Sequence, residues 1–346
     1  MKLFPVASLV TVRNLPNHAM NIRSALKPMV ETLGLKPALQ RGFFETGLLG
    51  ERLQFLFRSR PDPSHAILLA GSGRSGTTWL ADLLCSVPGV QQIFEPLREI
   101  HRWLPADAPA YPKTSYLRPD GQYPHWHALL YRVLTGQSRT YWTDTARTSF
   151  FPKRYLIKEV RANLMLGYIH DHFHPHIAYL SRHPCAVVAS RIGLGWRVDL
   201  DNLLCQEELI EDHLSPWVGR IEQAKTNPVA SHAIWLAVES RVAMLHLSTR
   251  PHYHSYYEHL VLRPEESLRT IFTRLGLDTG RIPEGKIKRN SRTTWRERYA
   301  NHPKETDYAL SNWKVQLSRE DQRAILDWAH RLEVTCYTDQ TLPVTS

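Results

Sequence analysis

Short strand-like segments recur through the chain, and stretches with helical spacing separate them. The strand-like segments cover residues 66–70, 90–94, 155–160, 176–181 and 254–260, and the first of them is apolar at every position. The stretches with helical spacing cover residues 77–84, 185–191, 264–275 and 321–332. Continuous apolar runs are typical of strands buried on both faces, and strands that alternate with helices are typical of a parallel sheet. The pattern therefore predicts an α/β fold in three layers, with a central parallel sheet flanked by helices.

Two segments depart from this alternation. Residues 101–150 are rich in Pro, Tyr, Trp and Arg and show little periodicity, so we expect an insertion with one helix near 125–135. Histidines alternate at His170, His172, His174 and His176. Because Pro175 interrupts regular strand geometry there, a solvated loop is favoured over a metal site.

The first 60 residues differ in charge from the rest of the chain. They hold nine basic and three acidic side chains, whereas the whole chain has a formal net charge of +10. Their apolar clusters predict two short helices within 20–58, and Pro61 and Pro63 indicate a linker. We therefore expect a basic, helical N-terminal extension at 1–60 and one domain at 61–346. The extension is expected either to dock on an anionic membrane surface, or to cap the domain or join copies of a homo-oligomer.

Composition excludes several classes of protein. An apolar fraction of 42% is enough for a buried core and excludes global disorder. No run approaches the ~18 apolar residues of a membrane-spanning helix, and no signal-peptide cleavage site follows the short apolar start of the chain. The four cysteines form no Cys-x-x-Cys pair, which excludes a disulfide scaffold and a cysteine-rich zinc site. Reduced, buried thiols are expected, as in a cytoplasmic protein.

The run from Gly71 to Thr78 has the spacing of a phosphate-binding loop between a strand and a helix. Glycine permits the backbone path that turns several N–H groups towards one anion, and the next helix adds the positive end of its dipole. A nucleotide-hydrolysing loop has Lys where this chain has Thr77, and no apolar strand ends in an Asp placed to hold Mg²⁺. A P-loop kinase that transfers phosphoryl groups is therefore the less favoured alternative.

Within this loop, the sequence Arg74-Ser75-Gly76-Thr77-Thr78-Trp79 resembles the 5′-phosphosulfate loop of sulfotransferases that use 3′-phosphoadenosine 5′-phosphosulfate (PAPS). The resemblance implies a P-loop sulfotransferase fold, with PAPS as the sulfuryl donor and no metal ion. It also implies that Arg74 and the loop from Gly73 to Thr78 hold the 5′-phosphate and the sulfuryl group. Trp79 is expected either to stack on adenine, as in the cytosolic branch of the family, or to pack in the core.

A second segment resembles the family's 3′-phosphate motif, in which an apolar strand leads to an Arg and a Ser follows eight residues later. Arg182 and Ser190 match these positions. Residues 257–266 resemble the family's Y-E-D-L…P-E segment, with His259 in place of Asp, and residues 312–318 resemble its W-K/R-x-x-L-S segment. The R-K-G sequence of the cytosolic branch is absent. The resemblance runs from about 65 to 337, apart from 101–150.

The reacting groups are assigned by the same resemblance. Glu95 lies in a segment similar to the F/Y-E-P-L element of carbohydrate sulfotransferases, which implies that it is the base for the acceptor hydroxyl. Lys158 matches the Lys of the cytosolic branch's R-x-x-x-K strand, which assists the departing phosphate. That branch has a His base where this chain has Val160, so the base is assigned to Glu95. The structural alternatives are a surface or N-cap position before Pro96 for Glu95 and an exposed strand position for Lys158.

The sequence thus predicts a PAPS-dependent sulfotransferase of the cytoplasm, with contact to a membrane through 1–60 where the acceptor is lipid-linked. The acceptor is expected to be a hydroxyl of a carbohydrate or glycolipid, with a small molecule or a protein as the alternative. A nucleic-acid-binding protein would fit the basic composition, but no recognition module is present, so no nucleic-acid partner is expected. A related fold without activity is the remaining alternative.

Overall fold

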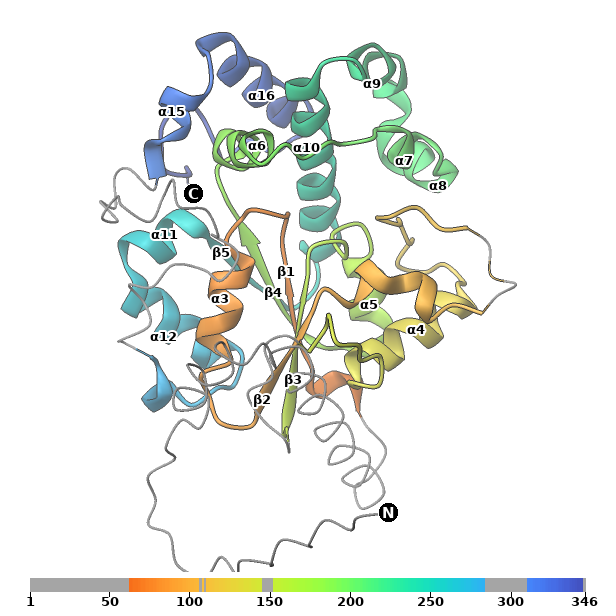
Figure 1. Cartoon of the computed structure of the whole chain (residues 1–346), viewed down its shortest axis with the longest axis vertical. Coiled ribbons are helices and arrows are strands. Elements are labelled where there is room, and N and C mark those ends of the chain that lie inside the picture. The colour runs from red at the N-terminus through yellow and green to blue at the C-terminus, as the bar shows by residue number, and fades with distance from the viewer. Residues whose placement is uncertain (1–61, 106–107, 109, 145–151, 284–309, 345–346) are drawn as a thin grey trace, which may run out of the picture. The chain divides into compact units, whose positions relative to one another are not determined.

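The computed structural model describes residues 62–105, 108, 110–144, 152–283 and 310–344. All of them lie in one unit, residues 48–346. This unit contains a five-stranded sheet in the order β2-β3-β1-β4-β5 (Figure 1). The strands are β1 (Ile67–Ala70), β2 (Val90–Phe94), β3 (Arg154–Glu159), β4 (His176–Ser181) and β5 (Tyr253–Tyr256). Every pairing is parallel, so the predicted central parallel sheet is confirmed.

β1 is the central strand, and all four of its side chains are buried. Leu68 and Ala70 belong to one hydrophobic cluster, whereas Ile67 and Leu69 belong to another. Successive side chains of a strand point to opposite faces of the sheet, so a strand covered on both faces needs a continuous apolar run. The strand predicted at 66–70 is confirmed, and its continuous apolar run fits its central place in the sheet.

Helices cover both faces of the sheet. α4 (Pro124–Leu134) and α5 (Leu166–Phe173) supply apolar side chains to the cluster that contains Leu68. α3 (Thr77–Leu84) and α12 (Pro264–Arg274) supply those of the cluster that contains Leu69. The two pairs of helices lie on opposite sides of the strands in Figure 1. The predicted three-layer α/β arrangement is confirmed.

A further group of helices packs together beyond the carboxyl end of β4, where the chain enters α6 (Pro184–Gly193). It consists of α6, α10 (Pro228–Leu247) and α16 (Arg319–Arg331). The short α15 (Trp313–Gln316) adds Trp313, which is fully buried and stacks on His183 with ring centroids 4.2 Å apart. The other short elements are η1 (Pro63–His65), η2 (Pro96–Arg102), α7 (Asp201–Leu204), α8 (Glu207–Leu209), η3 (Ile210–Leu214), η4 (Ser215–Trp217), α9 (Val218–Ala224), α11 (Tyr257–Leu262) and η5 (Thr279–Arg281).

The structure corrects three details of the expected fold. The strand predicted at 254–260 ends at Tyr256, because the chain turns into α11 at the next residue. The loop predicted around His170 is the last turn of α5, which continues to Phe173. α10 was not predicted, because its apolar side chains are spread around the helix and give no amphipathic pattern. The helix predicted near 125–135 is confirmed as α4.

Some predictions concern residues that lie outside the described ones. The basic extension at 1–60 and its two helices belong to this group, as do residues 106, 107, 109 and 145–150 of the predicted insertion. Within the described part of the chain, no helix is both long and apolar enough to cross a membrane.

Candidate active site

The glycine-rich loop, residues 71–76, connects the end of β1 to the start of α3. Gly76 precedes the first turn of α3 with a φ of 99°, and a Cβ atom there would lie 2.5 Å from the Tyr257 ring. Glycine is therefore required at this position by both the backbone and the close approach of the ring. Thr77 and Thr78 form the buried first turn of α3, where helical N–H groups have no partner within the helix. This geometry is that of an anion-binding loop.

The two segments predicted to bind phosphate meet at this loop. Arg74 Nε donates a hydrogen bond to Ser190 Oγ at 3.0 Å, and Arg182 Nη1 donates one to the carbonyl oxygen of Arg74 at 3.0 Å. The Arg182 guanidinium also lies over the Tyr257 ring, 4.3 Å from its centroid. The side chains of Arg74, Arg182 and Ser190 are thus collected around one loop, although the sequence separates Arg74 from Arg182 by 108 positions.

Two donors in this region have no hydrogen-bond partner among the described residues. Ser75 Oγ and Arg182 Nε are both buried and unpaired. Buried polar groups are normally hydrogen-bonded, so unpaired donors beside a cluster of arginines point to an anionic ligand.

Trp79 lies on α3 and is buried in the hydrophobic cluster that contains Leu69. Its ring meets Tyr257 edge to face, with centroids 6.1 Å apart. The core contact predicted for Trp79 is therefore present in the structure. Stacking on adenine stays a prediction.

Glu95 and Lys158 form an ion pair at the carboxyl ends of two neighbouring strands. Lys158 lies opposite Leu69 of β1 on one side and Phe94 of β2 on the other, and Glu95 directly follows Phe94. The Glu95 side chain is 15% exposed and that of Lys158 is 3% exposed, so neither has the surface position that was the alternative. Glu95 has a left-handed φ of 43° and occupies the N-cap position of η2, as the N-cap alternative expected, but its side chain makes no capping hydrogen bond.

The charge state of Glu95 results from opposing influences. Burial favours the neutral acid, but Lys158 and then Arg161 attract the carboxylate, and the net effect lowers its pKa below the usual value. Arg161 Nη1 lies 3.4 Å from Glu95 Oε2. In this arrangement Glu95 is ionised and can accept a proton, although the ion pair weakens it as a base.

Glu159 and Arg161 were missed by sequence reasoning. Glu159 is fully buried, and its carboxylate accepts hydrogen bonds from Leu97 N at 2.8 Å and Arg161 N at 2.9 Å. These bonds hold the turn after β2 against the end of β3, so they fix the backbone around Glu95. An acidic residue inside an apolar strand was the signal that could have identified it.

An aromatic and cationic group of side chains lies next to Glu95 and was also missed, because its Trp142 falls in the aperiodic region 101–150. Trp142 packs edge to face on Phe94, with centroids 5.4 Å apart, and the Arg98 guanidinium lies 4.1 Å from the Trp142 centroid. Phe94 N donates to the carbonyl oxygen of Thr143 at 2.8 Å, which joins this turn to the end of β2. Tyr141 is 49% exposed at its rim.

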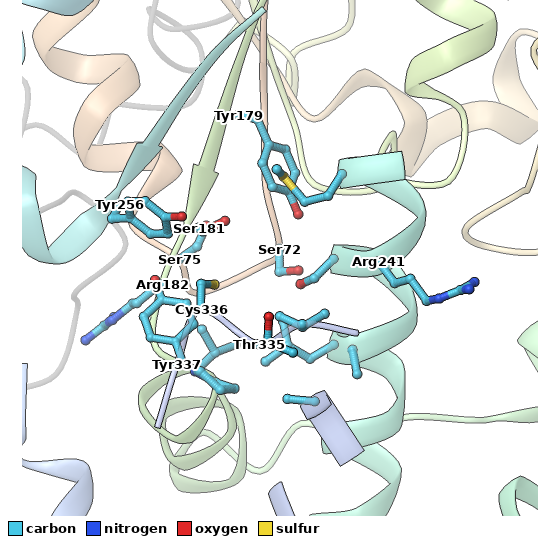
Figure 2. A pocket seen from close by; sticks show the side chains of 18 of the residues that line it. Ser72, Ser75, Tyr179, Ser181, Arg182, Arg241, Tyr256, Thr335, Cys336 and Tyr337 are labelled. Atoms are coloured by element: carbon cyan, nitrogen blue, oxygen red, sulfur yellow. The ribbon is translucent and has the colours of Figure 1, made fainter. Parts of the chain in front are cut away.

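A cavity of about 280 Å³ borders the glycine-rich loop, and Arg182 is among the residues that line it. Its lining includes Ser72 and Ser75 from the loop and Tyr179 and Ser181 from β4, and Figure 2 shows these side chains around it. The C-terminal segment closes another side with Cys336 and its neighbours. In the part of the chain that the structure describes, no three His, Cys, Asp or Glu side chains are grouped so that they could hold a metal ion.

Comparison with known proteins adds independent findings. The model described as "Sulfotransferase family" matches residues 66–281. The chain is similar to the sulfotransferase domain from the curacin biosynthetic pathway, with 16% identity, a TM-score of 0.43, and coverage of 78% of this chain and 98% of that one. The sulfotransferase STF9 from Mycobacterium avium has 13% identity and a TM-score of 0.42, with coverage of 83% and 81%. No curated protein sequence matches the chain.

Proposed function

The chain belongs to the sulfotransferase family, and on that basis we propose that it transfers a sulfuryl group from PAPS to a hydroxyl of a carbohydrate or glycolipid. When bound, PAPS supplies the sulfuryl group and leaves as adenosine 3′,5′-bisphosphate. The observation that carries the proposal is the meeting of two arginine segments at one glycine-rich loop. Ser75 Oγ and Arg182 Nε are buried there and have no hydrogen-bond partner within the ranges of the chain that the structure describes.

The residues present fit a donor with phosphate groups at two positions. The loop and the first turn of α3 offer backbone N–H groups, and Arg74 adds a cation at the same place. Arg182 and Ser190 offer a planar cation and a hydroxyl for a second phosphate. Fixed cations and amides of this kind stabilise negative charge that develops during transfer.

Lys158 and Glu95 are proposed to act on opposite sides of the transfer. Lys158 lies beside β1, which carries the loop, and neutralises negative charge there. Glu95 accepts the proton of the acceptor hydroxyl. When the Lys158 ammonium group turns from Glu95 to another anion, Glu95 loses its nearest cation, and burial acts against the attraction of Arg161 alone. The pKa of Glu95 then rises, and Glu95 becomes a stronger base.

The surface beside Glu95 supports a carbohydrate acceptor. Trp142 is half-buried, and the Arg98 guanidinium lies over its ring. A Trp ring is a group of the kind that packs on the C–H face of a sugar, and an Arg side chain offers several donors for hydroxyl groups. A glycolipid would present the same sugar near a membrane, and the basic residues of 1–60 would favour an anionic surface there. Because the cytoplasmic leaflet of a membrane carries the anionic lipids, we propose a cytoplasmic location.

Two measurements test the proposed function. Isothermal titration calorimetry with adenosine 3′,5′-bisphosphate is expected to show binding by the full chain, and no binding would contradict the donor. Incubation with ³⁵S-labelled PAPS and a panel of oligosaccharides, glycolipids, phenols and peptides is expected to label a sugar. Labelling of phenols or peptides alone would contradict the acceptor class, and transfer of label from γ-³²P-ATP would support a kinase instead.

A further inference from the structure

Two buried charged side chains from different helices form hydrogen bonds with the glycine-rich loop. Ser72 Oγ donates a hydrogen bond to Glu239 Oε2 at 2.8 Å, and Arg191 Nε donates one to the carbonyl oxygen of Gly73 at 3.1 Å. Arg191 Nη2 and Glu239 Oε2 pair at 3.5 Å, and these side chains are only 4% and 3% exposed. Arg191 belongs to α6 and Glu239 belongs to α10. The loop therefore depends on an ion pair to which the proposed function assigns no role.

The loop is closely packed at some positions and borders a cavity at others. A Cβ atom at Gly73 would lie 3.1 Å from the Trp196 ring. Ser72 and Ser75 line the cavity of about 280 Å³, and Figure 2 shows the Ser72 hydroxyl directed towards α10. An open space provides no contacts that would resist displacement of the loop on that side. The polar contacts with Glu239 and Arg191 therefore add to the hydrogen bond from Arg182 in determining the position of the loop.

The same contacts orient peptide groups of the loop. In a trans peptide the carbonyl and the N–H point in opposite directions. Arg191 holds the carbonyl of Gly73, so the N–H of Arg74 is directed away from Arg191. A carbonyl that was free to rotate could turn towards the phosphate side of the loop and repel an anion. The hydrogen bond from Arg191 prevents that rotation.

We propose that Arg191 and Glu239 are positioning residues that keep the glycine-rich loop in its phosphate-binding shape. This inference rests on the proposed function, because it assigns the loop to the 5′-phosphate. It predicts that the affinity for a 5′-phosphate depends on a charged pair that does not touch the ligand. It also predicts that the 3′-phosphate, assigned to Arg182 and Ser190, is much less affected.

A purely structural ion pair between α6 and α10 would behave differently. These helices also meet through apolar side chains, including Val188, Ala233 and Leu236. Replacing a buried ion pair by apolar residues of similar volume is often neutral or stabilising for the fold. The double variant Arg191→Met with Glu239→Leu is therefore expected to fold, while the contacts to the loop are lost.

The test measures the binding of adenosine 5′-monophosphate and adenosine 3′-monophosphate by calorimetry, together with the melting temperature. Ser72→Ala removes one hydrogen bond to a buried carboxylate, so we expect about tenfold weaker binding of the 5′-monophosphate. The double variant is expected to lose at least as much and to keep the wild-type melting temperature. Binding of the 3′-monophosphate should change less than about twofold in both. Ser248→Ala is the matched control, because it removes an exposed hydroxyl at the C-cap of α10.

Unchanged binding of the 5′-monophosphate in Ser72→Ala and in the double variant would overturn the inference. Equal weakening of both nucleotides, with a lowered melting temperature, would overturn it as well and show a general structural role. These results leave the proposed function intact as long as the wild-type chain binds adenosine 3′,5′-bisphosphate. A wild-type chain that binds none of the three nucleotides would overturn the proposed function and the inference together.

Discussion

The ion pair between Glu95 and Lys158 gives a quantitative prediction about the variant Lys158→Met. The substitution keeps a linear side chain and removes the cation nearest to a carboxylate that is only 15% exposed. Two unit charges about 4 Å apart interact by about 4 kcal/mol at an effective dielectric constant of about 20. Arg161, at 3.4 Å from Glu95, and water that enters the site compensate for part of this. We expect a net loss of about 2 kcal/mol for the charged form of Glu95, which raises its pKa.

The sign of the pH dependence follows from these shifts. In the wild-type chain the pKa of Glu95 is lowered, so its contribution to stability is present above its unfolded pKa and is lost as the pH falls through the folded value. In Lys158→Met, burial is expected to raise the folded pKa of Glu95 above the unfolded value, which penalises the folded state at neutral pH. The difference in unfolding free energy between the two proteins should therefore be about 2 kcal/mol at pH 7. It should shrink as the pH falls through the raised pKa of Glu95 in the variant.

Urea unfolding at several pH values between 4 and 7.5 measures this difference, and Glu95→Gln combined with Lys158→Met is the control. The combined variant carries no charge at either position, so the pH dependence due to Glu95 should be absent from it. A destabilisation by Lys158→Met that stays constant across this range would refute the reasoning. It would mean that the Lys158 side chain contributes packing rather than charge.

Four further predictions concern the reaction. Glu95→Gln should lower turnover by at least about 100-fold and leave the binding of adenosine 3′,5′-bisphosphate within about threefold, as measured by ³⁵S transfer and calorimetry; an active variant would exclude Glu95 as the base. Arg74→Ala and Arg182→Ala should each weaken that binding by about tenfold or more, because each removes charge-assisted hydrogen bonds, and unchanged affinity would contradict the donor site. Trp142→Ala should raise the KM for the acceptor without changing bisphosphate affinity; a change confined to the bisphosphate would contradict its acceptor role. Activity should be the same with and without EDTA, and dependence on a divalent metal ion would favour phosphoryl transfer instead.

The sheet could be predicted closely because its strands carry their own signal. The run at 66–70 is apolar at every position, and this is the pattern of a strand that is buried on both faces. The glycine-rich loop could be predicted because Gly76 satisfies a local backbone requirement. α10 and the helical end of the 254–260 segment could not be predicted, because α10 has no polar face and Tyr256 ends a strand without a turn signal.

By itself, the sequence determined the α/β class and the glycine-rich loop, because strand burial and loop geometry act over a few neighbouring residues. The candidate site residues were assigned by resemblance to the sulfotransferase family; they are Arg74, Arg182, Ser190, Glu95 and Lys158. Only the tertiary structure decided what these residues contact: that Arg74 reaches Ser190, that Lys158 pairs with Glu95, and that Glu239 and Arg191 hold the loop. Such contacts depend on which strands lie side by side and on how far helices from distant parts of the chain approach. No periodicity of the sequence records those distances, because they result from the packing of the whole core.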